Sequence, residues 1–125
     1  MRCAWFAALA ALTASAPALA TGGFECRATD RSGIQVSGVI GHGIASPLVS
    51  VRLVEARRAL STTGERPTLA IGQSWIDSRE IRLDLVDPQG LRYEARLRTN
   101  RMLRNQGTGT LVRNGRTHPV RCITE

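Results

Sequence analysis

Two cysteines near opposite ends of the chain constrain the fold more than any other sequence feature. Cys26 and Cys122 lie far apart in the 125-residue sequence, and neither belongs to a CxxC pair. An even pair of cysteines in an exported domain of this size is typical of a disulfide, whereas zinc and redox sites favour closely spaced cysteines. Such a bridge would join the first and last strands and contribute about 4–5 kcal/mol by restricting the unfolded chain.

The first twenty residues have the features of a secretory signal peptide. Arg2 precedes an apolar run, residues 3–12, that is much shorter than the roughly 20 residues a membrane span needs. Ala18-Leu19-Ala20 is a site for signal peptidase, and neighbouring alanines offer alternative sites. We predict cleavage near Ala20, which removes Cys3 and leaves a single periplasmic or secreted domain, residues 21–125. No later stretch is apolar enough to span a bilayer.

The mature sequence alternates apolar and polar residues with a period of two, which predicts β-strands. Residues 24–28, 34–40, 48–54 and 68–73 each place apolar side chains on one face of a strand. No run combines a helix cap with a 3.6-residue period, although residues 54–60 could form a short helical turn.

Asp87-Pro88-Gln89-Gly90 predicts a hairpin between two well-patterned strands. Proline presets the second position of a type I turn, and glycine accepts the left-handed conformation that follows. A three-residue loop would set Leu85 opposite Tyr93 and keep one face of the hairpin apolar. The same register places Asp84 opposite Glu94, so that opposite charges meet only on the diagonals.

Asn114-Gly115 predicts a tighter hairpin, because both central positions of a type I′ turn need positive φ. In this register Arg113 faces Arg116, and Leu111 faces His118 on the inner side of the sheet. We expect the arginines at the turn and on the outer face, where solvated charges discourage edge pairing.

Eight short strands separated by frequent turns predict an all-β fold. The expected architecture is a small antiparallel sandwich or barrel of about seven to eight strands. The predicted bridge between the first and last strands favours closure, and therefore the barrel.

The charge of the chain is strongly positive. Its 17 basic residues are all arginines, against 10 acidic residues, and loss of Arg2 would lower the net charge from +7 to +6. Without lysine, a Schiff base, a lysine general base and a P-loop are excluded. Nucleic acid is not an expected partner, since the chain is exported and keeps few aromatic residues, of which Phe24 and Tyr93 are expected inside.

Residues that could support catalysis or bind a metal are few. His42 and His118 are the only histidines, and neither has an acidic neighbour at ligand spacing. No serine lies in a G-x-S-x-G elbow. We expect Asp77 and Glu80 in a loop before a strand, and Asp84 as a salt-bridging outer residue. We therefore predict no catalytic residue, metal or cofactor, and no enzyme.

The candidate binding surface combines one tryptophan with several arginines: Arg57, Arg58, Trp75, Arg92, Arg96 and Arg98. Trp75 either packs in the core at a strand end, which we favour, or is an exposed anchor for a protein.

These residues predict a non-catalytic binding module, such as an inhibitor or adaptor for an envelope or extracellular protein. The alternative is a domain that binds an anionic polymer, glycolipid or peptidoglycan of the cell envelope through its arginines. Exposure of Trp75, or of residues 55–67 as an apolar patch, would favour the first function. Convergence of the arginines on one face would favour the second.

Overall fold

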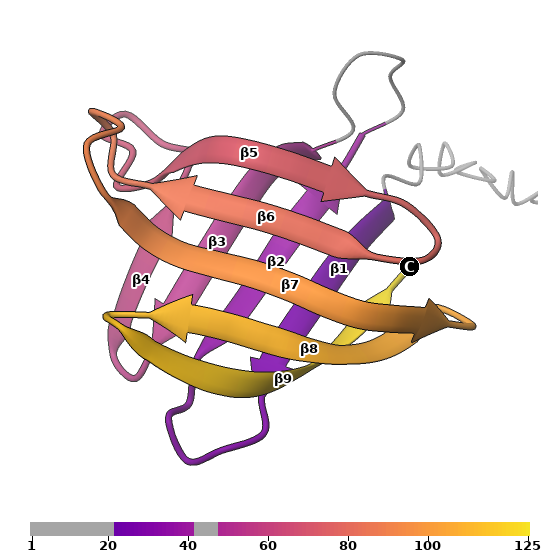
Figure 1. Cartoon of the computed structure of the whole chain (residues 1–125). Helices are drawn as coiled ribbons and strands as arrows, with labels where there is room; N and C mark the ends of the chain where they lie inside the picture. The colour runs from indigo at the N-terminus through magenta and orange to yellow at the C-terminus, as the bar shows by residue number, and fades with distance from the viewer. Residues whose placement is uncertain (1–21, 42–47) are drawn as a thin grey trace, which may run out of the picture.

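A computed structural model describes residues 22–41 and 48–125 of the chain. The predicted signal peptide and His42 lie outside these residues. The described part is all-β and forms one antiparallel sheet of nine strands, curled into a nearly closed barrel (Figure 1). The predicted fold class is therefore confirmed, with one strand more than expected.

The strands follow one another around the barrel in nearly their sequence order. They are β1 (Gly22–Ala28), β2 (Gln35–Ile40), β3 (Leu48–Glu55), β4 (Arg58–Ser61), β5 (Ala70–Ile76), β6 (Ile81–Val86), β7 (Tyr93–Leu103), β8 (Gln106–Arg113) and β9 (Arg116–Thr124). The sheet order is β4-β3-β2-β1-β9-β8-β7-β6-β5. In Figure 1, β1 to β4 form the rear wall and β5 to β9 the front wall.

Within the described part, the barrel is open only between β4 and β5. Strand direction cannot alternate all the way around a barrel of nine strands, because nine is odd. One pair of neighbouring strands must therefore run in the same direction. That pair is β4 and β5. Residues 62–69 connect these two strands, and the N–H groups of Thr68 and Leu69 donate to the carbonyl of Ser61, the last residue of β4, at 2.9 and 3.0 Å.

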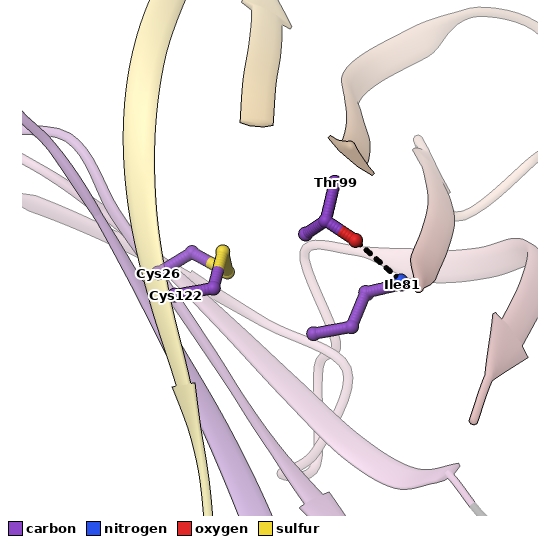
Figure 2. Close-up of a disulfide and its surroundings, with 4 residues drawn as sticks. All are labelled: Cys26, Ile81, Thr99 and Cys122. Atoms are coloured by element: carbon purple, nitrogen blue, oxygen red, sulfur yellow. Dashed lines mark hydrogen bonds between the residues drawn. A yellow bond between two sulfur atoms is a disulfide. The ribbon is translucent and has the colours of Figure 1, made fainter. Parts of the chain in front are cut away.

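β1 and β9 bring the two ends of the described chain together. Cys26 lies directly opposite Cys122, and the two form a disulfide. Figure 2 shows this bridge on one wall of the barrel, with Thr99 and Ile81 on the other side of the interior. The predicted clasp between the first and last strands is confirmed.

Large aliphatic side chains at alternate strand positions fill the interior. Those that are almost fully buried include Leu53, Leu69, Ile81, Leu83, Leu85, Leu97 and Leu111. Burying one such side chain contributes about 1.5–3 kcal/mol relative to leaving it exposed. Phe24 is buried as predicted, with its ring against Gly38, where a Cβ would overlap it.

The β6–β7 hairpin does not have the predicted register. Leu85 pairs with Ala95 instead of Tyr93, and Tyr93 is 61% exposed rather than inside. The shift of two residues keeps the leucines on the inner face. It also sets Asp84 opposite Arg96, so that an ion pair replaces the expected pair of acids. The cross-strand charges explain the preference for this register.

The side chain of Asp87 closes the longer loop that this register requires. Its Oδ1 accepts the N–H groups of Leu91 at 2.7 Å and Arg92 at 2.8 Å. The backbone hydrogen bond from Arg92 is the largest cause of the lowered pKa of Asp87. The carboxylate therefore stabilises a wider loop than the proline and glycine alone indicate.

Residues 54–60 do not form the helical turn that the sequence allowed. They form a tight hairpin, in which Ala56 has positive φ and Glu55 pairs with Arg58. The hairpin is stable because Leu60 on β4 lies opposite Leu53 on β3 and both are buried.

The Asn114-Gly115 hairpin has the predicted register, with Leu111 opposite His118. The expectation that its arginines lie outside is wrong for Arg113, whose side chain is only 5% exposed. Its guanidinium pairs with Glu55 of β3, across the barrel, and with Glu94 of β7, each at 2.9 Å. Two carboxylates offset the cost of burying this charge.

Gly109 should tolerate no side chain, because β7 bulges toward it between Thr99 and Arg101. A Cβ on Gly109 would overlap the Arg98 carbonyl oxygen and lie 2.7 Å from the Thr99 Cα. We expect Gly109→Ala to lower the free energy of unfolding by about 1–3 kcal/mol, measured in urea. Thr110→Ala, an exposed change on the same strand, is the control. Equal effects of the two changes would contradict the close approach.

Candidate functional site

The structure separates the candidate binding residues into two groups. Arg57 and Arg58 lie at the exposed β3–β4 hairpin. Trp75, Arg96 and Arg98 lie on the outer face of β5 and β7, and Arg92 is in the loop before β7. Of the second group, Trp75 and Arg98 line one pocket, together with Arg82, whereas Arg92 and Arg96 do not line it.

Three side chains from neighbouring strands form one row on the outer face, which we call the Trp75 row. Trp75 on β5 lies opposite Arg82 on β6, and Arg82 lies opposite Arg98 on β7. Trp75 is 59% exposed, so the favoured core position was wrong. The inward position at this strand end belongs to Ile76, which pairs with the buried Ile81.

Asp77 holds the indole of Trp75 in place. The indole Nε1 donates to Asp77 Oδ2 at 3.0 Å, and the backbone N–H groups of Arg79 and Glu80 donate to the other carboxylate oxygen at 2.8 and 2.9 Å. These bonds, with that from Arg79 the largest cause, lower the pKa of Asp77. The loop predicted for Asp77 and Glu80 is confirmed, and its carboxylate stays charged and orients the tryptophan.

A pocket with a volume of about 480 Å³ lies beside this row. It is lined by Gln73, Ser74, Trp75, Glu80, Arg82, Arg98 and Thr99. The pocket offers an aromatic ring next to two guanidinium groups and an amide. This combination suits a ligand surface that is partly apolar and carries hydrogen-bond acceptors.

The arginines near the pocket are largely neutralised by acids. Asp84 accepts ion pairs from Arg96 at 3.3 Å and Arg98 at 2.8 Å, and Arg96 lies over the ring of Tyr93. Asp84 is the outer salt-bridging residue that the sequence predicted, although the arginines bury it to 3% exposure. The surface around Trp75 is therefore polar but close to neutral.

Sequence reasoning missed Arg82 and Asp77 as members of this site. The spacing Trp75-x-Asp77 places the two side chains on one face of an extended strand. The turn formed by residues 77–80 joins β5 to β6. If the residues on either side of this turn, Ile76 and Ile81, face one another, then Trp75 faces Arg82. The turn could therefore have revealed both residues.

His118 belongs to a different contact. It is partly buried, and its Nδ1 lies 2.7 Å from Oδ2 of Asp30 in the β1–β2 loop. Among residues 22–41 and 48–125, no three His, Cys, Asp or Glu side chains are grouped as metal ligands.

Comparison with known proteins gives no match, whether to a family model, a curated protein or a solved structure. The fold itself defines the class, a small and nearly closed antiparallel β-barrel with a disulfide between its first and last strands. The disulfide is consistent with an oxidising periplasmic or extracellular compartment.

No helix in the part of the chain described by the structure is long and apolar enough to cross a membrane.

The Asp30–His118 contact predicts a stability change at acid pH. Hydrogen bonds from Ser32 and then His118 lower the pKa of Asp30 from 3.8 to about 2. A lowered carboxyl pKa stabilises the fold above the unfolded-state value, and this contribution is lost as pH falls from about 4 to about 2. The stability difference between the native protein and Asp30→Asn, measured by urea unfolding, should shrink across this range.

Ser32→Ala is the informative companion variant. It should weaken the same pH dependence in part, because the Ser32 side chain is the largest cause of the lowered pKa of Asp30. A difference between native protein and Asp30→Asn that is constant from pH 5 to pH 2 would show that the carboxylate charge is not what stabilises this contact.

Proposed function

We propose that the chain is an exported, non-catalytic binding module that docks on a protein of the envelope or the extracellular space through the Trp75 row. The signal-like residues 1–20 and the disulfide support export. The main support for this docking surface is the position of Trp75. Its side chain is exposed, is held by a hydrogen bond to Asp77, and lies in one row with Arg82 and Arg98.

Tryptophan and arginine are the residues that most often dominate protein interfaces. An indole buries a large apolar area and has few rotatable bonds to immobilise. The hydrogen bond to Asp77 restricts the ring before any partner arrives, which lowers the entropy cost of binding. These properties suit an inhibitor or adaptor that places one rigid anchor on its target.

β5 supports a protein partner in a second way. It is an edge strand, because in the described part of the chain it pairs with β6 along one edge and with no strand along the other. From Ala70 to Ile76 it carries no charged residue, so it lacks the charges that usually protect an edge. An extended segment of a partner could pair with the free edge while its side chains contact the Trp75 row. The alternative segment, residues 55–67, offers less, because its large apolar residue Leu60 is buried.

The alternative function, binding of an anionic polymer through the arginines named in the sequence, is less well supported at this face. Arg92, Arg96 and Arg98 each have a carboxylate within ion-pair distance. An internal carboxylate competes with any external anion for the same guanidinium group. A near-neutral row with an exposed indole favours a packed protein interface.

A capture experiment with variants tests this proposal. Oxidised protein of residues 21–125 is immobilised and exposed to envelope extract of the producing cells at about 50 mM and about 500 mM salt. We expect one protein to be retained at both concentrations, since a packed interface resists screening. Trp75→Ala should reduce retention about 30-fold, which corresponds to about 2 kcal/mol at a hot spot.

Val39→Ala is the matched control, because Val39 is 40% exposed and lies on β2, between β1 and β3 in the sheet. It should leave retention unchanged, and circular dichroism should show that both variants are folded. Equal retention of native protein and Trp75→Ala would sink the proposal.

A further inference from the structure

A second row of outer residues crosses four strands on another part of the barrel. Arg101 on β7 lies opposite Thr108 on β8, Thr108 opposite Arg121 on β9, and Arg121 opposite Arg27 on β1. All four residues are exposed. We call them the Arg121 row. It shares no residue with the Trp75 row.

Compensating acids are few along this row. Arg82, Arg92, Arg96, Arg98 and Arg113 each have a carboxylate within ion-pair distance. In the described ranges, Arg101 and Arg121 have none, and Arg27 contacts only Glu25 of its own strand. Three positive charges therefore face a single negative charge.

The central pair of this row is unfavourable without a ligand. Arg27 and Arg121 are directly opposite one another on adjacent strands, and like charges in that position destabilise a sheet. The residues two positions from Arg121 along β9 are Pro119 and Ile123, which carry no charge. A multiply charged anion placed over the pair would remove the repulsion.

The spacing of the row suits phosphate groups. Adjacent strands lie about 4.8 Å apart, so the backbone positions of Arg101 and Arg121 are about 10 Å apart, with the hydroxyl of Thr108 between them. Arginine side chains are long enough to meet over Thr108, and their planar forks match phosphate oxygens. With Arg27 added, the row is longer than one phosphate and fits several in succession.

We propose that the Arg121 row is a binding site for phosphate groups repeated along an extended ligand. Arg121 and Thr108 form the centre, and Arg27 and Arg101 lie on either side. This site goes beyond the protein-docking function and does not depend on it.

Titration calorimetry with sodium polyphosphate at several salt concentrations tests the site. The native protein should bind, and Arg121→Gln should weaken binding by about tenfold and lower the dependence of log K on log salt by about one. Arg66→Gln, the same charge change at an exposed loop residue, should change affinity less than twofold. Equal losses for the two variants would overturn the site, because overall charge alone would then explain binding.

Thermal unfolding without anions supplies a second readout. Arg121→Gln should raise the unfolding midpoint, because it relieves the repulsion with Arg27, while polyphosphate should stabilise the native protein and not the variant. A lower midpoint for the folded variant would show that Arg121 is structural and would overturn the proposal. Trp75→Ala should bind polyphosphate normally, so a failure of this site is distinguishable from a failure of the docking surface.

Sedimentation with vesicles identifies the source of the phosphate. Phosphatidylglycerol vesicles present lipid headgroups, phosphatidylcholine vesicles are the neutral control, and polyphosphate is the soluble polymer. Binding to either anionic probe that depends on Arg121 supports the site. Absence of binding to both at about 50 mM salt overturns it.

Discussion

The pairing of β1 with β9 is the interaction on which the barrel depends. Every other strand pair of the described sheet joins strands that follow one another in the sequence, whereas this pair joins strands whose bridged cysteines are 96 residues apart. Bringing such distant segments together has the largest loop-closure cost of any pairing here. The disulfide between Cys26 and Cys122 lies at this pair, where restricting the unfolded chain contributes most. Without the pairing of β1 with β9, the sheet would be two separate meanders, β1–β4 and β5–β9, joined only through residues 62–69.

Closure at β1 and β9 also determines where the barrel stays open. Because all neighbouring strands pair antiparallel, β4 and β5 run in the same direction at the two ends of the sheet. These two strands do not pair with one another. β5 therefore becomes an edge, and its outer-facing Trp75 lies next to unpaired backbone. The proposed docking surface thus depends on the strand number and on the position of the bridge. If β5 were paired on both sides, Trp75 would still be exposed, but no backbone edge would be free beside it.

The parts of the fold that could be predicted are those specified by local chemistry. Asn114-Gly115 determines a two-residue turn, and all pairings of that hairpin follow from it. The β6–β7 hairpin was mispredicted because the carboxylate of Asp87 closes a wider loop, and the Asp84–Arg96 pair then favours a register that the turn residues do not indicate. Arg113 was misplaced for a different reason. Its partner Glu55 is 58 residues away in sequence and is brought near only by barrel closure.

One strand, β7, contributes to both proposed surfaces, and its bulge keeps them apart. Arg98 lies before the bulge and belongs to the Trp75 row, whereas Arg101 lies after it and belongs to the Arg121 row. The two rows differ in their electrostatics. In the first, Glu80 pairs with Arg82 and Asp84 pairs with Arg98, whereas in the second no acid of the described chain pairs with Arg101 or Arg121. A neutralised arginine can be buried against a protein at low desolvation cost, while an unpaired one keeps its full attraction for an external anion. The distribution of ten acidic residues among seventeen arginines therefore matters more for recognition than the net charge of the chain.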